Sequence, residues 1–119
     1  MNTQPAQLRE RSKAFALRVI RLFRTLPYQT DTQVLGKQLL RCGTSVAANY
    51  RAACRSRSKA EFVARIGVVA EEADEAVLWL ELLTESGIIS ADKTETLLAE
   101  ARELAAIFTA SQQTAKNVA

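Results

Sequence analysis

The apolar residues of this chain recur every three or four positions in four successive segments, and this period constrains the fold more than any other feature. On a helical wheel such spacing places apolar side chains on one face, which then packs against other helices. We predict helices over about residues 8–26, 31–54, 59–86 and 91–110, followed by a frayed tail over residues 111–119. The predicted core stripes are Leu8, Phe15, Val19, Leu22 and Leu26; Leu35, Leu39, Cys42, Val46, Tyr50 and Ala53; Phe62, Ile66, Val69, Ala73, Val77 and Leu80; and Leu97, Ala101, Leu104 and Phe108.

Start and stop signals separate these segments. Pro27 ends the first, because proline lacks the amide hydrogen that a helix needs. Thr30 with Gln33, and Ser58 with Glu61, have the spacing of capping boxes at helix N-termini. The connections are short, so consecutive helices are expected to be antiparallel neighbours. The sequence therefore predicts one all-α domain over residues 1–119, an antiparallel up-down four-helix bundle.

The segment over residues 59–86 carries more apolar surface than one core contact requires. Val68, Leu78, Trp79 and Leu82 lie well outside the arc of its core stripe. A helix that is apolar on two faces either lies centrally or meets a second partner. We predict that these four residues form an interface with another subunit.

Gly43 lies inside the second predicted helix, where glycine costs up to ~1 kcal/mol relative to alanine. A close contact with another helix would explain it, and so would a local kink.

The residue types needed for catalysis are largely missing. The chain contains no histidine, which excludes Ser-His-Asp and Cys-His sites and most zinc sites. Glu71 and Glu75 share a helix face, but di-iron bundles also require Glu-x-x-His pairs, so solvated or ion-paired carboxylates are expected. Cys42 and Cys54 are ~18 Å apart along one helix, too far for a disulfide. We predict no catalytic residue, metal, cofactor or small-molecule substrate, and hence no enzyme.

No apolar run approaches the ~20 residues that span a bilayer, and the N-terminus lacks the form of a signal peptide. We therefore expect a cytoplasmic protein without membrane contact.

The charge is distributed unevenly. Residues 1–65 contain 13 Lys/Arg and three acids, whereas residues 66–119 contain three Lys/Arg and ten acids. Consecutive cations suit a phosphate backbone, because each contact releases condensed counterions. No aromatic residue is interleaved with the cations, so base stacking is not indicated and binding should not depend on sequence. The predicted nucleic-acid-binding residues are Lys37, Arg41, Arg51 and Arg55 on one helix face and Arg57 and Lys59 in the following loop.

Two interpretations of this asymmetry remain open. The chain is either a non-enzymatic homo-oligomeric module that binds RNA or DNA electrostatically, or a structural or protein-interaction scaffold. In the scaffold, basic helices would pair with acidic ones within a subunit or between subunits.

Specific motifs also identify a family. Residues 40–51 read LRCGTSVAANYR, and Ser58-x-x-Glu61-Phe62, Glu71-x-x-x-Glu75 and Trp79-Leu80 follow. Over about residues 8–110 the chain resembles the four-helix-bundle family of the 23S rRNA intervening-sequence proteins. It is distantly similar to the accessory protein of diversity-generating retroelements, a basic pentamer that binds nucleic acid and a reverse transcriptase. The resemblance implies a ring-like homopentamer and no established enzymatic activity.

Overall fold

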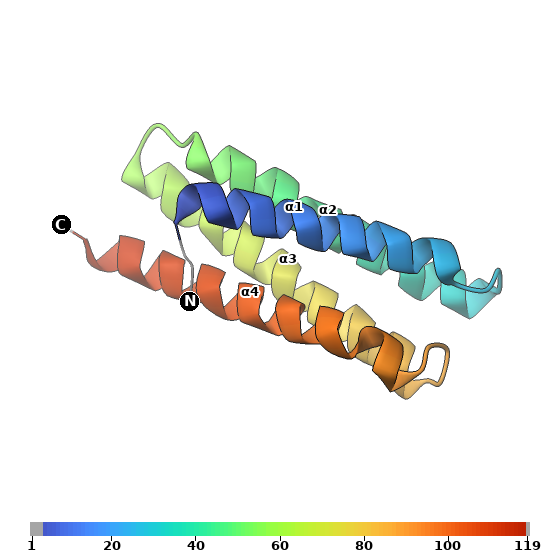
Figure 1. The fold of residues 1–119 in the computed structure, drawn as a ribbon. Coiled ribbons are helices and arrows are strands. Elements are labelled where there is room, and N and C mark those ends of the chain that lie inside the picture. Colours follow the sequence, from blue (N-terminus) through green and yellow to red (C-terminus); the bar gives the residue numbers. More distant parts are fainter. Residues whose placement is uncertain (1–3, 119) are drawn as a thin grey trace.

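The computed structural model describes residues 4–118 as four helices joined by short turns (Figure 1). The helices are α1 (Pro5–Thr25), α2 (Thr30–Cys54), α3 (Lys59–Glu85) and α4 (Ala91–Asn117). Each helix packs against the next along the chain, and α1 makes a smaller contact with α4 that closes the ring of four. The described chain measures 49 × 24 × 20 Å and contains no strand. The predicted all-α four-helix bundle is confirmed.

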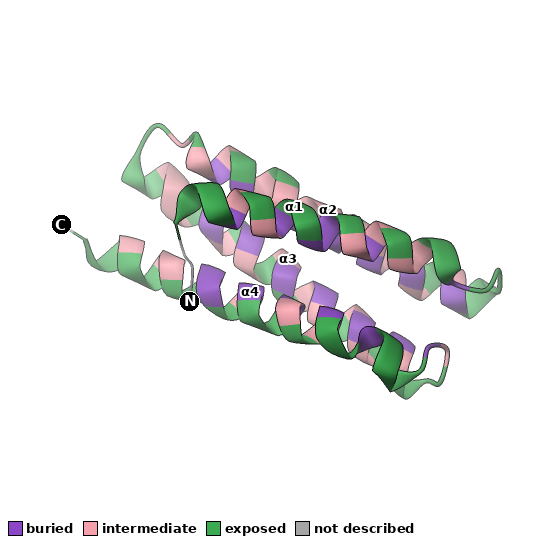
Figure 2. Cartoon of the chain, in the orientation of Figure 1, coloured by how far each residue is buried: buried purple, intermediate pink, exposed green. Residues whose placement is uncertain are grey.

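One stripe from each helix forms the core, and Figure 2 shows these buried positions running along the inward faces. Most of the predicted stripe residues are buried, whereas Leu22, Leu35, Phe62 and Val77 are only half-buried. Helix α3 also buries Ala76 and Leu83, outside its predicted stripe. This broader buried surface has a simple cause, since α3 packs against both α2 and α4. No helix within residues 4–118 is long and apolar enough to cross a bilayer.

The start of α2 differs from the prediction. The N-cap residue is Gln29, and no side chain provides a capping hydrogen bond, so the Thr30–Gln33 capping box is wrong. The Asp31 carboxylate lies in the first turn instead and accepts a hydrogen bond from the backbone N–H of Thr32 at 2.8 Å. The Gln33 side chain is therefore not used as a cap.

The start of α3 agrees with the prediction in part. The Ser58 hydroxyl accepts a hydrogen bond from the backbone N–H of Glu61 at 3.1 Å. The Glu61 carboxylate, however, accepts from the N–H of Arg57 at 3.4 Å rather than from that of Ser58. At the other end of α3, Gly87 adopts a positive φ of 84°, a conformation that favours glycine after a helix.

Helix α4 continues to Asn117, so the expected helix end near residue 110 and the frayed tail over 111–117 are wrong. The last two turns of α4 lie along the first turns of α3, where the Gln112 amide donates to the Val63 carbonyl at 3.1 Å. The Lys59 ammonium reaches the carbonyl of Val118. Contacts with α3 thus order a polar segment that has little tendency to bury itself.

Helices α1 and α2 approach closely at Gly43. A Cβ atom at this position would lie 2.9 Å from both methyl carbons of Val19, which is fully buried. At Gly36 a Cβ atom would lie 2.6 Å from a methyl carbon of Leu26. Gly43 is therefore explained by helix packing.

Replacing Gly43 with alanine is expected to lower the free energy of unfolding by about 1–2 kcal/mol, since overpacking against a rigid Val19 outweighs the gain in helix propensity. Chemical denaturation followed by circular dichroism measures this. Gly67→Ala is the matched control, because its Cβ atom would meet only the flexible end of Gln112. Equal effects of the two substitutions would contradict the close contact of α1 with α2.

Candidate nucleic-acid interface

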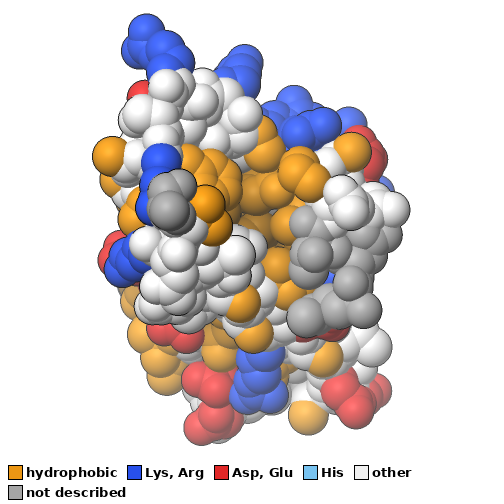
Figure 3. Space-filling model, turned by 90° about the vertical axis from the view of Figure 1, so that its left-hand side faces the viewer, with side chains coloured by type: hydrophobic (Ala, Val, Ile, Leu, Met, Phe, Trp, Pro, Cys, Tyr) orange, Lys and Arg blue, Asp and Glu red, His pale blue; other side chains and the backbone are white. Residues whose placement is uncertain are grey.

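The bundle consists of a basic pair of helices and an acidic pair. Residues 5–55, which include α1 and α2, carry ten Lys/Arg and two Asp/Glu. Residues 59–117, which form α3 and α4, carry five Lys/Arg and eleven Asp/Glu. Figure 3 views the end of the bundle where α1 begins and α2 ends, and it shows Lys and Arg side chains gathered along the upper rim. The charge asymmetry of the sequence is thus an asymmetry between two sides of one molecule.

The predicted cations of α2 form an exposed row along its outer face. Lys37, Arg41, Arg51 and Arg55 are all exposed. Eighteen residues of helix separate the first from the last, which is about 27 Å of rise. The row therefore extends over most of the length of α2.

Arg41 differs from the rest of this row because it is paired with acids. Its guanidinium contacts Glu72 at 3.0 Å and Glu75 at 2.7 Å, both on α3. The hydrogen bond with Glu75 raises the pKa of Arg41. The Trp79 indole N–H also donates to the Glu75 carboxylate, at 3.3 Å. Arg41 therefore joins α2 to α3, and its charge is less available to an external phosphate.

Arg51 and Arg55 lie in a different environment, at the C-terminal end of α2. With Arg9 of α1 they line a surface hollow that also includes Glu10 and the thiol of Cys54. None of these three arginines forms an ion pair with any of residues 4–118, whereas four other arginines do. The hollow is therefore a concentration of cations without a partner in the described chain.

Sequence reasoning missed Arg9. Its place in the hollow depends on α1 packing against α2, and no spacing within one helix indicates that contact. Burial, together with the neighbouring Cys54 thiol, raises the pKa of Tyr50, and the positive charge of Arg9 opposes this shift.

The two predicted cations of the α2–α3 turn have separate roles. Arg57 is exposed and its side chain is unpaired within residues 4–118. Lys59 donates to the backbone carbonyl of Val118 at the end of α4. Arg57 is thus a free cation in the turn two residues after Arg55, whereas Lys59 helps to hold α4 against α3.

Two basic residues of α1, Arg11 and Arg18, contact α4. Arg11 makes a bidentate contact with Glu100, at 2.6 and 3.1 Å, and a longer one with Glu103 at 3.5 Å. Such a paired geometry is stronger than a single contact, and it supports the small α1–α4 interface. Arg18 donates to the Thr96 hydroxyl at 2.8 Å. These side chains do not extend the row on α2.

The predicted oligomer interface lies on the outer face of α3. Val68, Leu78 and Leu82 expose 42%, 46% and 39% of their surface. Trp79 is half-buried beside them and is held by its hydrogen bond to Glu75. Leu78 and Leu82, one helical turn apart, expose adjacent apolar side chains without a partner in the described chain, and Val68 lies on the same face about 15 Å along the helix.

Comparisons with known proteins agree with this architecture. A family model described as 23S rRNA-intervening sequence protein matches residues 5–110. One similar solved structure is a crystal structure of a protein with unknown function from the S23 ribosomal protein family of Bacteroides thetaiotaomicron VPI-5482. It is 29% identical, with a TM-score of 0.84 over 92% of this chain and 97% of that chain. No curated protein is significantly similar in sequence.

The environment of Cys54 provides a test of the cationic hollow. At pH 8 the dianionic disulfide dithiobis(nitrobenzoate) is expected to react with Cys54 and not with Cys42, because burial raises the pKa of Cys42 to about 12. Replacing Arg51 and Arg55 together with Gln should slow the reaction at least threefold, since the guanidinium groups attract the dianionic reagent to the hollow. Release of nitrothiobenzoate measures the rate.

Lys37→Gln removes a charge at the other end of α2 and should leave that rate unchanged. If the arginine variant reacts as fast as the native protein, the hollow is not cationic in solution.

Proposed function

Because this chain belongs to the 23S rRNA-intervening sequence protein family, we propose that it is a non-enzymatic, self-associating protein that binds RNA or DNA through a cationic surface on α2. We define this cationic surface as the side chains that line the hollow and continue the row, namely Arg9, Lys37, Arg51, Arg55 and Arg57. Relative to the sequence prediction it gains Arg9 and loses Arg41 and Lys59, which are engaged within the chain. The family description gives a link to rRNA genes and assigns no activity to the chain.

One observation carries this proposal. The ion pairs of the basic helices are selective, since Arg11 and Arg41 reach acids of α3 and α4 while Arg9, Arg51 and Arg55 reach none within residues 4–118. If the cations served only to balance the acidic helices, those at the end of α2 would be paired as well. Exposed cations without a carboxylate partner suit phosphates, and such binding reads no sequence.

Self-association is proposed from the outer face of α3. Val68, Leu78 and Leu82 would be covered by a second copy of the chain, with Trp79 at the edge of the contact. The homopentamer implied by the family resemblance is our proposed assembly. A ring would repeat the cationic surface in each subunit and so raise avidity for a long nucleic acid.

The scaffold is the second candidate, and the Arg41 contacts favour it. They demonstrate that α2 pairs with carboxylates of α3 inside one chain. The same chemistry between subunits would use Arg51 and Arg55 against the exposed Glu71 of a neighbour. In that case charge changes at Arg51 and Arg55 would alter assembly rather than nucleic-acid binding.

Replacing Arg51 and Arg55 with Gln should weaken binding to a structured RNA at least tenfold at low salt. It should also reduce the slope of log affinity against log salt by about two units, roughly one for each lost phosphate contact. Fluorescence anisotropy with labelled RNA across a salt series measures both quantities. The control Lys93→Gln/Arg102→Gln removes the same charge from the acidic side and should change little. A flat salt dependence of the native protein would contradict the proposal.

Replacing Leu78 and Leu82 with Glu should lower the mass of the assembly, because buried carboxylates without partners oppose the subunit contact. Size-exclusion chromatography with light scattering measures the mass. Leu17→Glu, at an exposed leucine of α1, is the matched control and should keep the native mass. A monomeric native protein, or equal effects of the two changes, would exclude this interface.

A further inference from the structure

Tyr28 is the most exposed large apolar side chain that the structure describes, with 92% of its surface accessible. It lies in the turn between α1 and α2, between Pro27 and Gln29, whose N–H donates to the Pro27 carbonyl at 3.1 Å. Leu26, two residues before Tyr28, is buried against the core. The turn is thus short and anchored, and it presents an aromatic ring to solvent.

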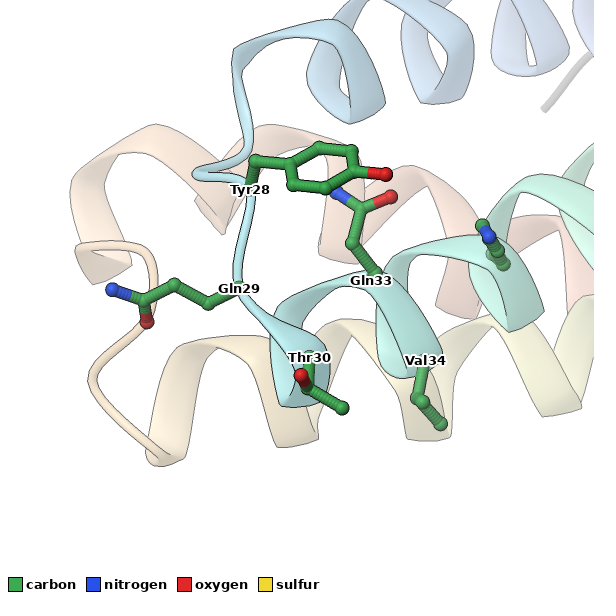
Figure 4. A pocket seen from close by; sticks show the side chains of 6 residues that line it. Tyr28, Gln29, Thr30, Gln33 and Val34 are labelled. Carbon is green, nitrogen blue, oxygen red and sulfur yellow. The ribbon is translucent and has the colours of Figure 1, made fainter.

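The ring borders a surface hollow at the first turns of α2, shown in Figure 4. Tyr28 and Gln33 both line this hollow, and in that view the side chains of Gln29 and Val34 point away from the ring. The Gln33 amide makes no side-chain hydrogen bond with any of residues 4–118, and it does not cap α2. The residues that line the hollow are Tyr28, Gln29, Thr30, Gln33, Val34 and Lys37.

Three of these groups match the parts of a nucleotide. An exposed tyrosine ring offers a face for stacking, which is favourable for every base. The unused amide of Gln33 offers a donor and an acceptor for a base edge. Lys37 follows one helical turn later and is the first cation of the cationic surface. The hollow is therefore continuous with the surface proposed for phosphates.

We propose that this hollow holds one unpaired base of a single-stranded RNA or DNA, with the base stacked on Tyr28, its edge near Gln33 and a phosphate at Lys37. The inference rests on the proposed function and assigns to it a preference for single strands. A base inside a duplex is stacked on its neighbours and has no free face for the ring. The Asp31 carboxylate does not border the hollow, and it is engaged by the N–H of Thr32.

The test compares native protein, Tyr28→Ala and Tyr28→Phe by fluorescence anisotropy, using a labelled 12-nucleotide single-stranded RNA and a 12-base-pair RNA duplex. Loss of one stacked base is expected to weaken single-strand binding of Tyr28→Ala at least fivefold. Duplex affinity should stay within twofold, and the salt slope should not change. Tyr28→Phe keeps the ring and should retain the native affinity. Melting temperatures check that both variants are folded.

The other outcomes separate this inference from the proposed function. If the native protein binds neither RNA at low salt, the proposed function itself fails. If it binds both and Tyr28→Ala changes neither affinity, the stacking site is excluded and the cationic surface stands. Equal weakening for single strand and duplex would also exclude stacking. A change of assembly mass in Tyr28→Ala, with unchanged RNA affinity, would assign the hollow to a second copy of the chain.

Discussion

The close packing of α1 on α2 is the constraint on which the remaining structure depends. Gly43 leaves room for the methyl groups of Val19, and without that room the two helices would separate. Both helices are basic, so their contact concentrates positive charge on one side of the molecule. The like charges of α1 and α2 repel each other, and the burial of apolar side chains offsets this repulsion. Two sets of ion pairs also connect the basic helices to the acidic ones. These are Arg11 with Glu100 and Glu103, and Arg41 with Glu72 and Glu75.

The same arrangement sets apart two groups among the arginines. Arg11 and Arg41, at the seams between the basic and acidic helices, are held by carboxylates and contribute to the contacts of α1 with α4 and of α2 with α3. Arg9 of α1 and Arg51 and Arg55 at the end of α2 form no ion pair with any of residues 4–118 and line one hollow. The excess of Lys and Arg in the first half of the sequence thus gives one region of the surface in which arginines lie together without carboxylate partners. The turn with Tyr28 lies at the opposite end of α2, so the proposed base site and the hollow are separated by most of the helix.

Much of the fold followed from sequence, because helix periodicity reports burial directly. The stripe of α4, from Leu97 to Phe108, is buried as predicted, and the motif around Gly43 identified the family. What sequence could not provide were contacts between helices. The order of α4 beyond residue 110 comes from α3, for example from Gln112 against Val63. Arg41 looked like a free cation because its acidic partners are 31 and 34 residues away. Tyr28 escaped notice because it lies in a turn, outside any helical period.

Arginine side-chain NMR distinguishes the ion-paired arginines from those of the hollow. The Nε–H resonances of the native protein would be followed during titration with a structured RNA at low salt, with assignments from single Arg→Lys variants. The resonances of Arg9, Arg51 and Arg55 are expected to shift together in a saturable manner, while those of Arg11 and Arg41 stay in place. Shifts confined to Arg11 and Arg41, or no shift at the three arginines of the hollow, would contradict this distinction.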